Sequence, residues 1–265
     1  MNHHWIEGES LGDVAGRFPL VGDVPPPPRI AIVGSRAAHR HLLRLVPALV
    51  AECGRAGFSV VSGGARGIDA MVHRAALRAA VPQLAVLPLG PDCPYPADHR
   101  RLFDRIAGAP SSGLLFAQPP GTAPRRGMFA SRNRLVVAAS AAVLVVQAGL
   151  RSGSIQTGRH ALRRGRKVVV VTGTPGAAEL ARRGALRIDP HADPAEAMAR
   201  VLAGGRPPAR AWPAHLRTLE AVVRAGPARG VGVEDLPDAA LVAALCEAEA
   251  LGLLVEVSPG RYLPA

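Results

Sequence analysis

Lysine is almost absent from this chain, although the chain is strongly basic. Its 265 residues carry a formal net charge of +12, and Lys167 is the only lysine, so nearly all of the positive charge is arginine. Residues 212–265 hold 4 arginines against 7 acidic residues, whereas residues 1–211 hold 28 basic against 13 acidic residues, a net charge of +15. We therefore expect a polyanion to bind the larger, amino-terminal part. The alternative is an arginine-rich composition that gives only a solvated basic surface.

Cysteines and aromatic residues are also scarce, and this excludes several kinds of protein. Cys53, Cys93 and Cys246 stand far apart, and the nine histidines are scattered, so neither a disulfide framework nor a metal site is expected. Aromatic residues make up 3% of the chain, which limits base stacking and favours contact with a nucleic-acid backbone at weak sequence specificity.

Long apolar runs are missing as well. No window reaches the length of a membrane span, and Met1–Ser10 is polar where a signal peptide needs an apolar core. The sequence predicts a cytoplasmic protein that does not use a membrane as a partner.

What the chain does have is a repeated pattern of short apolar runs that end in small residues and arginine. Residues 29–33 predict a strand buried on both faces, which stops at Gly34 and is followed by Ser35 and Arg36. Further strands are expected at 58–61, 83–89, 114–117, 142–148 and 167–171, with helices between them. This alternation predicts an α/β fold with a doubly wound, mostly parallel Rossmann-like sheet.

Four parts of the chain are predicted from composition and pattern. Residues 1–28 are predicted to form a flexible, Pro-rich amino-terminal segment, and residues 29–203 a Rossmann-like domain that binds the polyanion. A linker rich in Gly, Pro and Arg is expected over 204–213. The remaining residues 214–265 predict two helices and a hairpin that turns at Pro259-Gly260, which is typical of a small winged-helix domain.

The ends of the predicted strands offer several phosphate-binding sites, which we call phosphate seats. Small residues expose backbone amides, helix N-termini add a positive dipole, and arginine grips phosphate oxygens through a planar fork. Several seats along one sheet edge suit successive phosphates of a nucleic-acid strand better than one compact cofactor. The predicted phosphate-binding residues are Gly34, Ser35, Arg36, Gly63, Gly64, Arg66, Arg132, Asn133, Arg134, Arg151, Ser152, Gly153 and Ser154, with Arg132–Arg134 expected on a fourth loop.

Dinucleotide binding and catalysis are not supported by the motifs. The Rossmann fingerprint needs a second glycine two residues after the first, but Gly34 is followed by Ser-Arg-Ala-Ala-His. His73 is expected to pack or cap within a helix, Asp69 to satisfy free amide groups as an N-cap or first-turn carboxylate, and Asp92 to stabilise a turn. We therefore expect no cofactor and no catalytic set, and hence a protein that is not an enzyme.

In order and spacing, a set of motifs over about residues 29–173 resembles the DNA-processing protein A (DprA/Smf) family. They are Ile32-Val33-Gly34-Ser35-Arg36, Ser62–Asp69 with His73 and Leu77, Gly90-Pro91-Asp92 with Tyr95-Pro96, Pro120-Gly121-Thr122, Phe129 with Arg132-Asn133-Arg134, and Arg151-Ser152-Gly153-Ser154 with Thr157. The resemblance implies a homodimer that binds single-stranded DNA and hands it to the recombinase RecA, a step of natural transformation. It also implies that Arg36 and Arg151 grip the phosphates, without a cofactor.

This chain departs from the family pattern at several positions. Gln118 and Gln147 stand where the family usually has glutamate, and His99 where it usually has asparagine. The segment after Gly173 is shorter than usual, which affects the expected dimer contacts. The carboxyl-terminal helix 238–251 carries acidic residues and no arginine, which favours a partner-binding or autoinhibitory role over DNA reading.

Two other classes of function stay open at this point. One is a nucleotide-processing enzyme related to phosphoribohydrolases, whose P-G-G-x-G-T-x-x-E motif supplies a glutamate that Pro119-Pro120-Gly121-Thr122 lacks. The other is a nucleotide-sensing domain in which the carboxyl-terminal part relays the signal. Preference for a mononucleotide over an oligonucleotide would distinguish both from a DNA-binding mediator.

Overall fold

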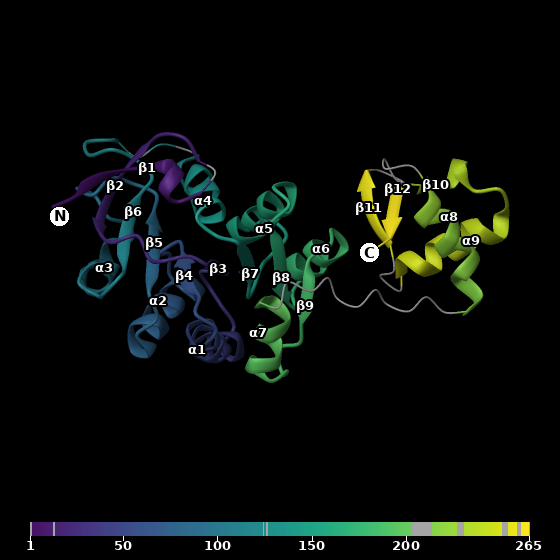
Figure 1. Ribbon diagram of the computed structural model, residues 1–265, viewed down its shortest axis with the longest axis horizontal. Helices are drawn as coiled ribbons and strands as arrows, with labels where there is room; N and C mark the ends of the chain where they lie inside the picture. The colour runs from purple at the N-terminus through teal and green to yellow at the C-terminus, as the bar shows by residue number, and fades with distance from the viewer. Residues whose placement is uncertain are drawn as a thin grey trace.

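The apolar runs of the sequence form the strands of one large sheet in the computed structural model. The structure describes residues 2–12, 14–123, 125, 127–202, 214–226, 231–250, 254–258 and 261–264. Nine strands pair in the order β1-β2-β6-β5-β4-β3-β7-β8-β9 (Figure 1). Their bounds are β1 His4–Glu7, β2 Arg17–Gly22, β3 Arg29–Val33, β4 Ser59–Ser62, β5 Gln83–Leu87, β6 Gly113–Phe116, β7 Ala142–Val145, β8 Lys167–Val171 and β9 Leu186–Ile188.

Helices cover both faces of this sheet, as the predicted doubly wound α/β fold requires. The helices are α1 Arg40–Arg55, α2 Ile68–Ala79, α3 Arg100–Ala107, α4 Met128–Ala138, α5 Gly153–Arg163, α6 Pro175–Arg182 and α7 Pro194–Leu202. Helices α4, α5 and α6 pack on one face, and α1, α2, α3 and α7 pack on the other (Figure 1). The seven strands from β6 to β9 in sheet order are all parallel, which confirms the predicted fold class.

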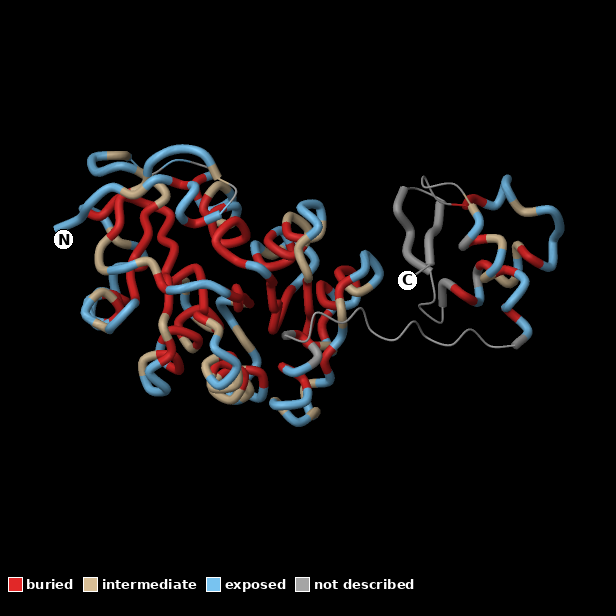
Figure 2. Tube along the Cα trace, viewed as in Figure 1, coloured by how far each residue is buried: buried red, intermediate tan, exposed pale blue. Residues whose placement is uncertain are grey.

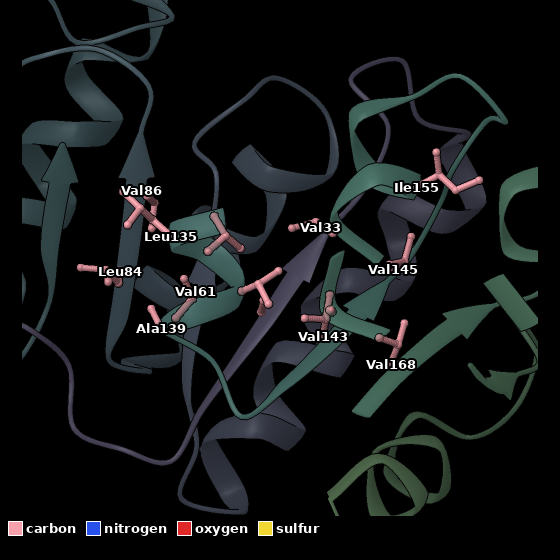
Figure 3. Close-up of a cluster of buried hydrophobic side chains, with 14 of the residues drawn as sticks. Val33, Val61, Leu84, Val86, Leu135, Ala139, Val143, Val145, Ile155 and Val168 are labelled. Atoms are coloured by element: carbon pink, nitrogen blue, oxygen red, sulfur yellow. The ribbon is translucent and has the colours of Figure 1, made fainter. Parts of the chain in front are cut away.

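The core lies between the sheet and these two helical layers. Strand residues such as Val33, Val61 and Val143 point toward Leu135 and Ile155 of the helices α4 and α5 (Figure 3). The middle strands are buried along their whole length, whereas the helices expose their outer faces (Figure 2). Because every β-branched side chain in these strands is buried, the scaffold that carries the strand ends is rigid.

The amino-terminal residues differ from the prediction of a flexible segment over 1–28. Strand β2 pairs antiparallel with β6, and β1 pairs antiparallel with β2, so this segment extends the sheet. Leu11 and Leu20 are each 1% exposed and belong to the main core. The prediction is wrong because the apolar residues here are few and interrupted by Gly and Pro, and they gain a buried partner only from the rest of the fold.

The strand order places a topological switch point between β3 and β7. From β3, the chain adds β4, β5 and β6 on one side, and then crosses to add β7, β8 and β9 on the other. Ligands of open α/β sheets bind at the carboxyl ends of the strands beside such a point. Strands β3 and β7 pair directly, and beyond their ends the Oε1 of Gln147 accepts a 2.9 Å hydrogen bond from the backbone N–H of His39.

The carboxyl-terminal residues form a second, smaller set of elements. They are α8 Arg217–Ala225, β10 Val231–Gly232, α9 Ala239–Ala250, β11 Leu254–Ser258 and β12 Arg261–Pro264, with three antiparallel strands in the order β10-β12-β11. Leu219, Val223 and Leu245 lie in their own buried cluster. The winged-helix assignment stays a prediction, and the expected linker 204–213 and the turn at Pro259-Gly260 lie outside the described residues.

Candidate nucleic-acid interface

The turn after β3 is held close to the start of α2. A Cβ on Gly34 would lie 2.5 Å from the Cγ1 of Ile68, so only glycine lets the two segments approach this closely. The backbone N–H of Ile68 donates a 3.2 Å hydrogen bond to the carbonyl of Ser35. The first two predicted phosphate seats therefore belong to one rigid unit.

The second glycine turn, after β4, is built around an arginine from a distant helix. A Cβ on Gly63 would overlap the Nη1 of Arg132 and lie 2.6 Å from the Oδ2 of Asp69. Gly64 has a φ of +70°, a backbone conformation that favours glycine. The carbonyl of Gly64 lies 3.0 Å from the Nδ1 of the buried side chain of His99. Glycine at position 63 is thus required by the space that the guanidinium occupies.

Arg132 and Asp69 form a buried ion pair beneath this turn. The Nη1 of Arg132 lies 3.8 Å from the Oδ2 of Asp69, and both side chains are less than 10% exposed. Burial raises the pKa of Asp69, opposed by the charge of Arg132, and burial lowers the pKa of Arg132. The Oδ2 of Asp69 also accepts a 3.3 Å hydrogen bond from the backbone N–H of Ala65, so the pair shapes the second turn.

One prediction about these residues is wrong. Arg132, Asn133 and Arg134 lie within α4 and not on a loop, because the apolar residues from Leu135 to Ala138 need a helix that begins earlier, at Met128. Asp69 lies in the first turn of α2, the second of its two predicted positions, while Gly67 takes the N-cap position. Its carboxylate accepts from the backbone N–H of Ala65 in the glycine turn, a partner that the sequence pattern did not specify.

A pocket of about 80 Å³ opens where these turns meet. The guanidinium of Arg36 stacks over the ring of Phe129, with its Cζ 5.0 Å from the ring centroid. Tyr95 meets Phe129 edge to face, with ring centroids 5.8 Å apart. The pocket is lined by Arg36, Gly63, Ala65, Arg66, Pro88, Tyr95, Pro96, Phe129 and Arg132.

The aromatic residues of this pocket were missing from the predicted site. Tyr95 is 41% exposed and Phe129 38% exposed, which is unusual for large side chains in a chain that has few aromatic residues. Both residues occur in the motifs shared with the family, and this was the feature of the sequence that could have placed them in the site. The predicted residues Arg36, Gly63, Arg66 and Arg132 come together at this pocket, which supplies flat apolar surface as well as cations.

Arg66 forms an ion pair with the carboxylate of Asp98. Its Nε and Nη2 donate hydrogen bonds of 3.1 Å each to the two oxygens of Asp98. The hydrogen bond with Arg66 lowers the pKa of Asp98, and the same bond raises the pKa of Arg66. Because both side chains are more than half exposed, this pair is available for exchange with a phosphate.

The third phosphate seat is the N-terminus of α5. The Oγ of Ser152 accepts a 3.3 Å hydrogen bond from the backbone N–H of Ile155 and donates a 2.8 Å bond to the carbonyl of Gly149. The Nδ2 of Asn133 donates a 3.4 Å hydrogen bond to the carbonyl of Gly153, which joins this seat to α4. Arg151 and Arg134 are exposed, and neither makes an ion pair within the described part of the chain.

His73, the histidine singled out in the sequence as a possible base, does not reach the carboxyl edge of the sheet. His73 is fully buried, with its Nδ1 2.8 Å from the Oε1 of Gln83, and burial lowers its pKa to about 4. It therefore packs in the core, as predicted. Within the described residues, no group of three or more His, Cys, Asp or Glu side chains is arranged to hold a metal ion. In the same residues, no helix has the length and apolar character that crossing a bilayer demands.

The comparison with protein families gives one match that covers most of the chain. The family model described as DNA recombination-mediator protein A matches residues 20–202. This range begins within β2 and extends to the end of α7, so that it includes the whole parallel sheet and all three phosphate seats.

Individual proteins similar to this chain are also DNA processing proteins. A DNA processing protein DprA from Mycobacterium tuberculosis is 39% identical over 238 residues, which cover 86% of this chain and 60% of that protein. The structure of DNA processing protein A from Streptococcus pneumoniae matches with a TM-score of 0.63 and 27% identity, over 71% of each chain. That of Helicobacter pylori, described for its single-stranded DNA binding mode, matches with a TM-score of 0.62 and 27% identity, over 71% of this chain and 91% of that one. The present chain thus spans 60% of the length of its mycobacterial relative.

Proposed function

This chain belongs to the DNA recombination-mediator protein A family, and on that premise we propose that it binds single-stranded DNA at the carboxyl edge of its sheet and delivers it to a RecA-type recombinase. The observation that carries the proposal is the pocket at which Arg36, Phe129 and Arg132 meet beside two glycine turns. Binding of single-stranded DNA by the Helicobacter pylori relative supports the same role for this chain.

Each part of the site has a task in this proposal. The exposed guanidinium groups of Arg36 and Arg151 pair with backbone phosphates, and the N-terminus of α5 accepts a further phosphate through its free amides and its dipole. The rings of Phe129 and Tyr95 offer a surface for one base, with Arg36 as a cationic partner. With so few aromatic residues, sequence specificity should be weak.

A single strand suits this pocket better than a duplex. The exposed rings of Tyr95 and Phe129 can stack on a base only when that base is unpaired and turned away from its neighbours. A duplex keeps its bases stacked inside and presents only phosphates. We therefore expect duplex DNA to bind through electrostatics alone and more weakly.

A salt series with two ligands tests this function. Fluorescence anisotropy with labelled oligo(dT) and with a labelled mononucleotide should show tight oligonucleotide binding that weakens steeply with salt. Neutralisation of about four phosphates predicts a slope of log K against log salt near −3. Preference for the mononucleotide with a shallow slope would overturn the proposal and favour the nucleotide-processing or nucleotide-sensing alternative.

Assembly and delivery need separate measurements. Mass measurement in solution, with and without oligonucleotide, should give a homodimer that is retained on DNA. Delivery predicts that the chain shortens the lag in DNA-dependent ATP hydrolysis by a RecA-type recombinase on strands coated with a single-strand-binding protein. An unchanged lag at saturating protein would restrict the function to DNA binding.

A further inference from the structure

The outer surface of α4 and α5 carries basic side chains beyond the strand ends. Neither helix contains an Asp or a Glu. Arg134 of α4, His160 and Arg163 of α5, and Arg164 at the C-cap of α5 form what we name the α4–α5 basic strip. The arginines of this strip are exposed, and His160 is half-buried.

The members of the strip lie near one another. Gln156, His160 and Arg163 recur at intervals of four and three residues and therefore share one face of α5. Gly158 is on a different face, where a Cβ would lie 2.6 Å from the Cδ1 of Leu180 in α6. The pKa of His160 is lowered first by burial and then by the charges of Arg163, Arg164 and Arg134, which places the α4 arginine within electrostatic range of α5.

The carboxylate of Glu179, on the adjacent helix α6, is already paired with arginines outside the strip. Glu179 of α6 accepts hydrogen bonds from Arg159, Arg182 and Arg183 at 3.0, 2.6 and 2.7 Å. These bonds, that from Arg183 above all, lower the pKa of Glu179. One carboxylate shared among three guanidinium groups leaves this side of the sheet with an excess of positive charge.

The strip is continuous with the candidate site. Asn133, beside Arg134 in the sequence, donates to the carbonyl of Gly153 at the first turn of α5. From there α5 runs 11 residues, about 16 Å, to Arg163. This length corresponds to roughly five nucleotides of a stacked strand at 3.4 Å each.

We propose that the α4–α5 basic strip binds the phosphates of the nucleotides that flank those held at the strand ends, so that the single strand leaves the site along α4 and α5. This inference rests on the proposed function. A nucleic-acid backbone fits better than a protein surface, because the large exposed hydrophobic residues among those described are Trp5, Tyr95, Phe129, Leu150 and Val233, and none belongs to the strip. Protein interfaces need such residues at their centre.

Charge reversal at matched positions tests the path. Arg163 and Arg78 are both exposed, and both lie in the last turn of a helix, but α5 and α2 cover opposite faces of the sheet. R163E and R78E therefore change the net charge and the helix-end electrostatics equally. Affinity is measured by anisotropy for oligo(dT) of about six and about 20 nucleotides; the first lies near the lower end and the second above the upper end of the roughly 4–16-nucleotide site sizes of single-strand binders. Thermal denaturation confirms that both variants are folded.

The expected result is a loss of affinity that depends on length. R163E should bind the long oligonucleotide about tenfold more weakly, with a salt slope about 0.7 shallower, and the short one within twofold of the wild type. R78E should match the wild type for both. Equal losses in the two variants, equal losses for the two lengths, or no loss would each overturn the path along α4 and α5.

Two other outcomes are distinct from these. If the wild type binds neither oligonucleotide, the proposed function itself fails, and the strip has no DNA to bind. If R163E keeps full affinity for the long oligonucleotide but impairs delivery to the recombinase, the strip contacts a protein partner, and our proposal is wrong while the proposed function stands.

Discussion

The Nη2 of Arg29 donates a 2.8 Å hydrogen bond to the carbonyl of Leu11, which fastens the amino-terminal residues to the first parallel strand. The same guanidinium donates to the carbonyls of Ala139 and Pro25 at 2.8 and 3.0 Å. Burial lowers the pKa of Arg29, yet its charge faces only backbone oxygens in these contacts. One side chain therefore joins the start of the chain, β3 and the end of α4.

Replacement of Arg29 should release the amino-terminal strands. R29L leaves three carbonyls without their donor and should lower the free energy of unfolding by about 3 kcal/mol, because buried oxygens that lose a charged donor are costly. Chemical denaturation measures the loss, and amide hydrogen exchange should show β1 and β2 losing protection first. R17L, which changes an exposed arginine of β2, is the control and should stay within about 0.5 kcal/mol of the wild type. Equal protection of β1 in R29L and the wild type would contradict this role.

The space at Gly63 should be needed for both stability and binding. G63A places a methyl group where the Nη1 of Arg132 lies, so the Arg132–Asp69 pair must move, at a cost of about 2 kcal/mol or more. Oligo(dT) affinity should fall at the same time, because the pocket loses its shape. G149A, in the loop before α5, has open space around its Cβ and should behave as the wild type. A G63A variant with unchanged stability and affinity would show that the turn is not tightly constrained.

Removal of two exposed arginines should abolish DNA binding without unfolding the chain. R36A together with R151A removes the cation over Phe129 and the cation before α5, so anisotropy should show loss of oligo(dT) binding. Circular dichroism and thermal denaturation should match the wild type. R74A together with R78A, two exposed residues of α2, is the matched control and should bind normally. Retained affinity in a folded R36A/R151A variant would refute the assignment of these residues.

Neutralisation of Asp98 should strengthen binding. D98N removes one of the two oxygens that accept hydrogen bonds from Arg66 and removes a negative charge beside the pocket, so the guanidinium is held less firmly. Affinity for oligo(dT) should rise several-fold at low salt, and the salt slope should steepen by about 0.7, as for one added phosphate contact. D104N, which neutralises an exposed carboxylate of α3 paired with Arg100, is the control and should leave the slope unchanged. Weaker binding by D98N would indicate that Asp98 holds Arg66 in its binding position.

The buried histidine should make the fold sensitive to acid. The pKa of His73 is about 4 in the folded chain and 6.5 when exposed, so below pH 6.5 the unfolded state binds the proton more readily. The stability present above pH 6.5 is then lost as the pH falls toward 4, by up to about 3 kcal/mol. H73Q should lack this part of the pH dependence while keeping that of Asp69, whose raised pKa acts in the opposite direction. Denaturation midpoints with the same pH dependence in both proteins would contradict the assignment.

Most of the parallel sheet could be predicted from the sequence, because strands buried on both faces must be continuous apolar runs. Residues 29–33 and 167–171 are strands as expected. The amino-terminal strands could not be found in this way. Leu11 and Leu20 are isolated in the sequence, and only contact with distant residues buries them.

The candidate site, too, was predictable in part from local sequence and in part only from the tertiary structure. By itself the sequence determined that glycine turns and arginines stand at the ends of parallel strands, since local sequence decides where a strand stops and a helix begins. Only the tertiary structure decided that Arg132 is buried against Asp69, that Arg66 is paired with Asp98, and that Arg36 covers Phe129. These partners lie between 32 and 93 positions apart in the chain, and contacts at such separations depend on how the strands are ordered in the sheet, which no local pattern specifies.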